Sequence, residues 1–174
     1  MSQNIVNPYH YAGVASTLLW QQSSTGETEG LWSGGLVRAG QLFEAGHTVV
    51  GKTPTKFVFN LKKTESPSGN AVLNLVDDAD PTNVKATFPL ESTGLPLVAS
   101  TLTTSFVSTT FTNDANTETI DADDRVVFYY SGNKYFYLER CASCAESDTQ
   151  GTYYTGGSWT NNNTVLSTME VWGY

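Results

Sequence analysis

Residues 55–62 read TKFVFNLK, and this stretch decides the fold class. Phe57, Phe59 and Leu61 alternate with polar residues such as Asn60, so one face of the segment is apolar and the other is polar. A period of two residues is typical of a half-buried β-strand and not of a helix. The stretch therefore predicts a strand with one face on a hydrophobic core.

The sequence on either side continues in short strands and turns. Residues 66–70, SPSGN, carry Pro and Gly where a tight reversal of the chain needs them, and residues 72–76 follow as the returning strand. The runs 106–111, 125–130 and 168–174 are rich in β-branched or aromatic residues, which suit a pleated, half-buried surface. Short strands with regular turn signals predict a sandwich or a jelly roll.

Length and composition agree with a single all-β domain. The chain has 174 residues and a mass of 18.9 kDa, and a division into two domains would leave each half with a marginal core. Nine Tyr, eight Phe and four Trp supply large side chains for sheet faces. We therefore predict an antiparallel β-sandwich of the jelly-roll type over residues 35–174.

The charge balance and the lack of long apolar runs argue against nucleic acid and the membrane interior as partners. Nine Lys and Arg stand against 17 Asp and Glu, which gives a net charge of −8 and an isoelectric point near 4.5. Without a basic stripe to neutralise phosphates, binding to nucleic acid is not expected. No apolar run approaches the about 20 residues that a membrane-spanning helix needs, so membrane insertion is not expected either.

Residues 1–34 differ from the rest of the chain and are predicted to form an N-terminal arm. The arm is extended, with a short turn of helix expected over residues 14–20. Its large apolar side chains need a partner surface, which is either its own domain or a neighbouring subunit. The residues expected at such an oligomer interface are Leu18, Trp20, Leu31 and Trp32.

The first eight residues lack the basic and apolar regions of a signal peptide. If Met1 is the native start, we expect a protein that is not exported by the general route and that works inside a cell or in a virus particle. If a leader has been removed, an exported protein is expected instead.

Several runs of the chain are similar to those of a broad group of jelly-roll domains. These are residues 39–46, 57–63, 66–70 and 120–128, which combine a strand, a Pro-Gly turn and an acidic turn before a buried strand. The group occurs in secreted, surface-anchored and viral proteins, often beside carbohydrate-binding modules. The resemblance covers residues 36–174 and implies a binding, adhesive or particle-building role.

The acidic turn of Asp121, Asp123 and Asp124 is a candidate metal site. Calcium takes six to eight oxygen ligands, and the carboxylates and carbonyls of a loop supply them. The alternative is that these side chains accept hydrogen bonds from backbone N–H groups and shape the turn before the strand. We expect no cofactor unless this turn binds calcium.

Cys141 and Cys144 form the only Cys-x-x-Cys pair. A zinc site would need His10 and His47 as further ligands, and their spacing is unlike that of known zinc motifs. The remaining alternatives are two free thiols and a local disulfide, which is the expected form in an oxidising medium.

Residues 141–164 are predicted to form a long polar loop that carries the best candidate for a ligand site. Exposed aromatic rings stack on the apolar faces of sugars, and amide side chains bind the hydroxyl groups. The residues expected to bind a carbohydrate are Tyr153, Tyr154, Trp159 and Asn161. The alternative is that these rings cover one end of the sandwich.

No sequence signal points to catalysis. The chain has neither a Gly-x-Ser-x-Gly nucleophile motif nor a Gly-rich phosphate-binding loop, and nothing pairs two of its glutamates. We therefore expect a non-enzymatic structural protein of a virus particle, as a capsid decoration, turret or tail-tip subunit. The alternative is a carbohydrate-binding or adhesion module of an extracellular or surface protein. Expected partners are further copies of the chain, a capsid or tail protein, or glycans.

Overall fold

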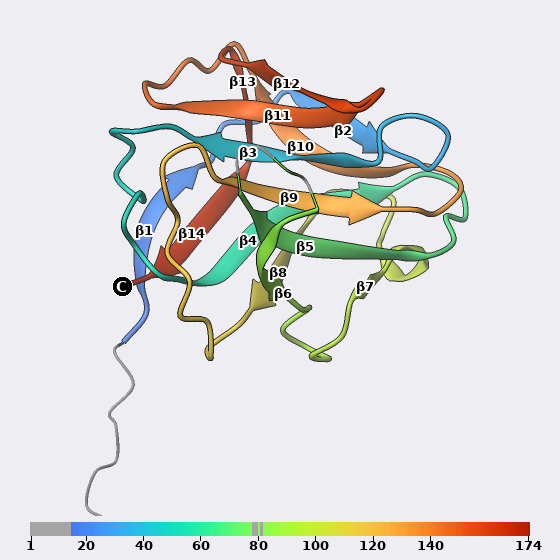
Figure 1. Cartoon of the computed structure of the whole chain (residues 1–174). Coiled ribbons are helices and arrows are strands. Elements are labelled where there is room, and N and C mark those ends of the chain that lie inside the picture. Colours follow the sequence, from blue (N-terminus) through green and yellow to red (C-terminus); the bar gives the residue numbers. More distant parts are fainter. Residues whose placement is uncertain (1–14, 78–79, 81) are drawn as a thin grey trace, which may run out of the picture.

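The computed structural model describes residues 15–77, 80 and 82–174. It is an all-β sandwich of two antiparallel sheets, as predicted, and Figure 1 shows β11, β3, β9 and β5 side by side and crossed by β14 and β4 of the other sheet. The finer jelly-roll topology stays a prediction. Among the described residues, no helix has the length and apolar character needed to cross a membrane.

Sheet A holds seven strands around the long central strand β4. They are β1 (Thr17–Gln22), β2 (Glu27–Leu31), β4 (Pro54–Lys63), β8 (Val107–Thr112), β10 (Phe136–Ala142), β13 (Val165–Ser167) and β14 (Met169–Gly173). Strand β4 follows the predicted alternation, since Phe57, Phe59 and Leu61 are buried and the residues between them are half-buried.

Sheet B also holds seven strands, and its centre is formed by β3 and β9. They are β3 (Arg38–Phe43), β5 (Asn70–Val76), β6 (Val84–Phe88), β7 (Leu97–Val98), β9 (Arg125–Tyr130), β11 (Thr149–Thr155) and β12 (Ser158–Asn162). A single turn of 3-10 helix, η1 (Ala99–Thr101), follows β7.

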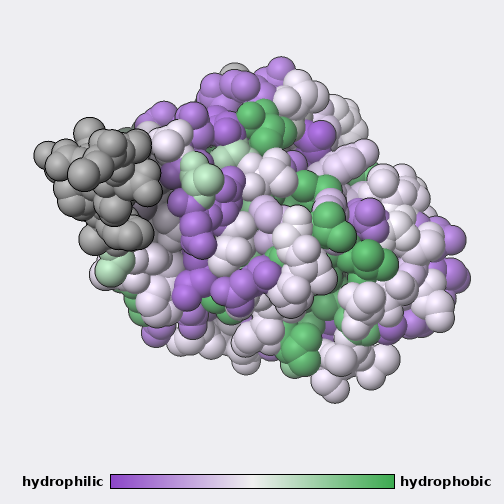
Figure 2. Space-filling model, turned by 90° about the horizontal axis from the view of Figure 1, so that it is seen from below, coloured by the Kyte–Doolittle hydropathy of each residue, from purple (hydrophilic) through white to green (hydrophobic). Residues whose placement is uncertain are grey.

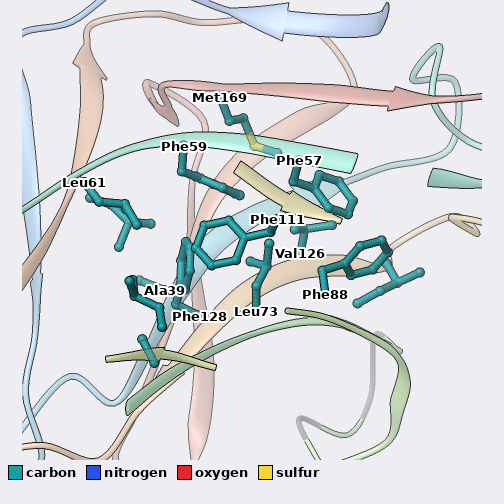
Figure 3. Packing of buried hydrophobic residues seen from close by; sticks show 14 of the residues in the cluster. Ala39, Phe57, Phe59, Leu61, Leu73, Phe88, Phe111, Val126, Phe128 and Met169 are labelled. Atoms are coloured by element: carbon teal, nitrogen blue, oxygen red, sulfur yellow. The ribbon is translucent and has the colours of Figure 1, made fainter. Parts of the chain in front are cut away.

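The core between the sheets is dominated by aromatic rings (Figure 3). The ring of Phe128, on β9, lies 5.0 Å from that of Phe59, 5.2 Å from that of Phe111 and 5.4 Å from that of Phe136, all in edge-to-face geometry. This geometry sets the positive edge of one ring against the negative face of the next and stabilises the pair beyond the area it buries. Phe128 of sheet B thus packs against β4, β8 and β10, which are three strands of sheet A.

The described part of the predicted arm lies across its own domain as two strands of sheet A. Strand β1 pairs with β14, and β2 pairs with β10. The helical turn expected over residues 14–20 is wrong from residue 17 onward, where β1 begins, because pairing with β14 satisfies the backbone groups that a helix would have satisfied internally. Residues 1–14 lie outside the described residues.

The long polar loop expected over residues 141–164 is wrong as well, because most of it is paired. β11 and β12 form a hairpin whose turn is Gly156-Gly157, with φ values of +60° and +92°. A two-residue hairpin turn of this kind needs positive φ at both positions, which glycine adopts without strain. Cys141 and Cys144 form a disulfide, so the local-disulfide alternative is the one the structure has.

Candidate functional site

The register of four strands brings four large side chains into one row on the outer face of sheet B. Arg38 of β3 is paired with Tyr129 of β9 on one side and with Tyr154 of β11 on the other, and Tyr154 is paired with Trp159 of β12. On a strand, successive side chains point to opposite faces. The neighbouring Phe128 is fully buried and Tyr129 is 38% exposed, so the row lies on the face away from the core.

The side chains of this row contact one another. The guanidinium carbon of Arg38 lies 5.1 Å from the ring centroid of Tyr129 and 5.6 Å from that of Tyr154. The rings of Tyr154 and Trp159 are 5.1 Å apart and inclined at 66°. A cation over an aromatic face is attracted by the negative charge density of the ring. The row is therefore held in place before any ligand arrives.

A polar group lies on the same face, two residues from Tyr154 and from Trp159 along β11 and β12. The hydroxyl of Thr152 donates a hydrogen bond of 2.8 Å to Oδ1 of Asn161, and Nε of Arg125 lies 3.3 Å from the same hydroxyl oxygen. The Arg125 guanidinium also lies 4.8 Å from the ring centroid of Trp159. Within the described part of the chain, the buried indole N–H of Trp159 has no hydrogen-bond partner. The exposed amide of Asn161 thus borders the aromatic row and is held in place by the buried hydroxyl of Thr152.

The structure separates the four residues that the sequence predicted as a ligand site. Tyr154, Trp159 and Asn161 share the outer face, but the half-buried Tyr153 packs against the core cluster. The segment was predicted to be a loop, in which neighbouring side chains can point the same way. In strand β11 they alternate, so Tyr153 cannot join Tyr154 on the outer face.

Arg38 and Tyr129 were missed by the sequence analysis. They are 91 residues apart in the chain, and only the pairing of β3 with β9 brings them together. Residues 125–130 are buried at every position except Tyr129, so their sequence carries no alternation that would have placed Tyr129 on an outer face. No sequence signal reveals which residue of another strand lies opposite it.

The acidic turn before β9 is organised around a lysine. Nζ of Lys85 lies 2.7 Å from Oδ2 of Asp121 and 2.7 Å from Oδ2 of Asp124, and the backbone N–H of Asp121 donates to Asp124. Hydrogen bonds from Lys85 and Thr119 lower the pKa of the Asp121 carboxyl. Burial raises the pKa of Asp124, against the opposing effect of Lys85.

These bonds are those of the turn-shaping alternative. The carboxylates of Asp121 and Asp124 share the ammonium of Lys85, and Asp123 adopts a φ of +70° in the turn. Across residues 15–77, 80 and 82–174, no three His, Cys, Asp or Glu side chains are grouped in a way that could hold a metal ion. Calcium binding at this turn stays an untested alternative, and the contacts of Lys85 favour the turn-shaping one.

The four residues expected at an oligomer interface have different surroundings. Leu31 is fully buried in the core of its own domain, so its expected role in an interface is wrong. Trp20 is half-buried against Phe43 and His47. Leu18 and Trp32 are 41% and 37% exposed, and for them the interface stays a prediction.

Comparisons with protein family models, with curated proteins and with solved structures each found no match. The assignment of a function therefore depends on the geometry of the described residues. In the aromatic row on the outer face of sheet B, Tyr129 is exposed and Arg38, Tyr154 and Trp159 are half-buried.

Proposed function

We propose that the protein is a non-enzymatic binding protein that binds neutral glycans on the outer face of sheet B. The observation that carries the proposal is the row of the exposed Tyr129 and the half-buried Tyr154 and Trp159, held by cation–ring and ring–ring contacts on the outer face of sheet B. Pyranose rings have apolar C–H faces that stack on aromatic rings, and a row of rings on a sheet offers several such contacts.

The polar neighbours of the row fit the same ligand class. The exposed side-chain amide of Asn161 lies beside the rings and is already oriented by the hydrogen bond that it accepts from the buried hydroxyl of Thr152. A preorganised surface loses little side-chain entropy on binding. The Cys141–Cys144 disulfide supports an extracellular or virion location for such a protein, because disulfides persist in oxidising environments.

A glycan array followed by titration of the best binder tests the proposal. We expect Trp159→Ala and Tyr154→Ala each to weaken binding at least about tenfold, which corresponds to about 1.4 kcal/mol. Tyr135→Ala is the matched control, because Tyr135 is 39% exposed and belongs to the segment that leads into β10 of the other sheet. Equal affinities of the wild type and both sheet B variants would contradict the proposal, provided that circular dichroism shows all variants folded.

A second candidate is the structural role in a virus particle, as a capsid decoration, turret or tail-tip subunit. One observation favours it. Figure 2 shows hydrophobic residues at the surface of the face seen from below. Over residues 84–107, the exposed large apolar side chains are Val84, Leu95, Val98 and Val107. Exposed apolar groups of this kind mark protein–protein contacts.

Light scattering of the purified protein tests this second role. Assembly through these side chains predicts a discrete oligomer that Leu95→Asp dissociates, because a buried carboxylate without a partner destabilises an interface. Leu95 is 63% exposed, so the substitution does not disturb the core. If the protein is a monomer at every concentration, the proposal that copies of the chain assemble with one another is contradicted.

A further inference from the structure

A hollow of about 130 Å³ lies on the outer face of sheet A, where strand β4 changes its pairing partner. Strand β4 pairs with β14 up to Phe59 and with β10 from Leu61 onward, so Asn60 is the residue at which β4 changes partner. Its side chain lies on the face away from the core. The side chains of β1, β4, β8 and β14 that line the hollow include Gln21, Gln22, Val58, Asn60, Ser108 and Glu170.

The polar groups of this hollow are fixed by bonds to their neighbours. Nδ2 of Asn60 donates to Oε2 of Glu139 at 2.7 Å, and Oδ1 of Asn60 accepts from the hydroxyl of Ser108 at 2.9 Å. Oε2 of Glu170 accepts from the indole N–H of Trp172 at 2.7 Å. Each of these side chains is thereby oriented by a partner outside the ligand space.

These bonds leave hydrogen-bonding capacity directed at the hollow. Among the described residues, Oε1 of Glu170 and the amide nitrogen of Gln22 have no hydrogen-bond partner, and Asn60 Nδ2 has used one of its two hydrogens. The hollow therefore presents an acceptor and two N–H donors. Val58, on the strand between Glu170 and Ser108, adds an apolar surface.

The charges around the hollow balance. Glu139 and Glu170 lie on this face, and two lysines flank them on β4. Nζ of Lys56 lies 3.8 Å from the ring centroid of Trp172, and Nζ of Lys62 lies 4.3 Å from that of Phe106. Two carboxylates and two ammonium groups leave no net charge to be matched, which favours a neutral ligand.

We propose that this hollow binds one neutral pyranose, the terminal sugar of a glycan. Its hydroxyls donate to Oε1 of Glu170 and accept from the N–H groups of Asn60 and Gln22, and its C–H groups contact Val58. The hollow has room for several water molecules but not for an extended chain. This site lies on the opposite sheet from the aromatic row and does not depend on the function proposed for that row.

Titration of the ¹⁵N-labelled full-length protein with free D-glucose, D-galactose, D-mannose and L-fucose tests the proposal. The side-chain amide signal of Asn60 is assigned by its loss in Asn60→Asp. We expect at least one sugar to shift the Asn60 and Gln22 amide signals with saturation in the millimolar range, as is usual for a single sugar held by a few hydrogen bonds. No shift with any of the four sugars would overturn the proposal.

Variants of Glu170 separate this site from the rest of the surface. Glu170→Gln keeps an acceptor for Trp172 but loses the charge-assisted bond to the sugar, so we expect at least about fivefold weaker binding. Glu170→Ala should abolish the shifts. Glu118→Ala, an exposed carboxylate elsewhere, should leave them unchanged. Binding that survives Glu170→Ala overturns the site. The sheet B site is tested separately by the Trp159 variant in the glycan titration. That variant should leave the sugar-induced shift of the Asn60 signal unaffected.

Discussion

The rings inside the sandwich and the rings outside it have different partners. In the core, Phe128 contacts Phe59, Phe111 and Phe136 edge to face. On the surface, Tyr129 and Trp172 each lie against a cationic side chain, Arg38 and Lys56 respectively. Among the described residues, each cation–ring contact involves a ring outside the core cluster.

This difference follows from the cost of burying charge. A cation placed between the sheets would lose its hydration, whereas the half-buried Arg38 and Lys56 keep part of their contact with water while they lie against a ring. Ring–ring packing therefore stabilises the fold, and ring–cation packing orients exposed rings at modest cost. Aromatic content alone therefore does not show whether a ring packs in the core or lies on a binding surface.

Adjacent residues of β9 give the sharpest test of this comparison and the largest expected effect. Phe128→Ala should lower the free energy of unfolding by about 3–5 kcal/mol, because it removes a ring from the centre of the core. Tyr129→Ala should lower it by less than about 1 kcal/mol, since that ring lies on the outer face. Denaturant unfolding measures both values. Equal losses for the two variants would break the distinction between interior and surface rings.

His47 tests what happens when a titratable ring lies among interior rings. It is buried, 5.2 Å from the ring of Trp20 and 4.9 Å from that of Phe43. Burial lowers its pKa from the usual 6.5, while the carboxylates of Glu146 and Asp148 oppose the shift. The unfolded chain therefore takes up the proton more readily than the folded chain.

Stability should consequently fall as the pH drops below about 6.5, by up to about 1.4 kcal/mol per pH unit until the folded-state pKa is reached. Denaturant unfolding as a function of pH measures this slope. His47→Phe should remove this part of the pH dependence, because a phenyl ring takes up no proton. A variant whose stability falls as steeply as that of the wild type between pH 6.5 and 5 would show that other groups cause the effect.

Lys56 measures the contribution of a surface cation to a ring. Its ammonium lies 3.8 Å from the ring centroid of Trp172. We expect Lys56→Gln to lower the free energy of unfolding by about 0.5–1 kcal/mol, the range of exposed cation–ring pairs. Lys52→Gln is the control, because the exposed Lys52 contacts no ring in the described part of the chain. A loss above about 2 kcal/mol would mean that surface rings support the fold as interior rings do.

The smallest expected effect is that of added calcium. Lys85 already supplies the positive charge between Asp121 and Asp124, so we expect millimolar calcium to leave the melting temperature unchanged. Calorimetry with calcium and with a chelator measures this. A calcium-dependent rise that disappears in Asp124→Asn would show that the ion displaces Lys85 and that this surface needs an external cation.

The local elements of the sandwich were predictable from the sequence alone. Alternation over residues 55–62 predicted β4, and the turn residues 66–70 predicted the reversal before β5, because side-chain period and turn chemistry are local properties. The Gly156-Gly157 pair was also a local hairpin signal, but the polar residues around it led to the prediction of a loop. An edge hairpin buries little apolar area, so its strands carry no hydrophobic alternation.

Which side chains meet depends instead on long-range strand pairing. Tyr129, Arg38 and Tyr154 form one row because three strands far apart in the sequence pair in one register. A shift of that register by one residue would turn every side chain of a strand to the other face. The core that the two sheets share selects the register, and for this reason no single segment contains the site.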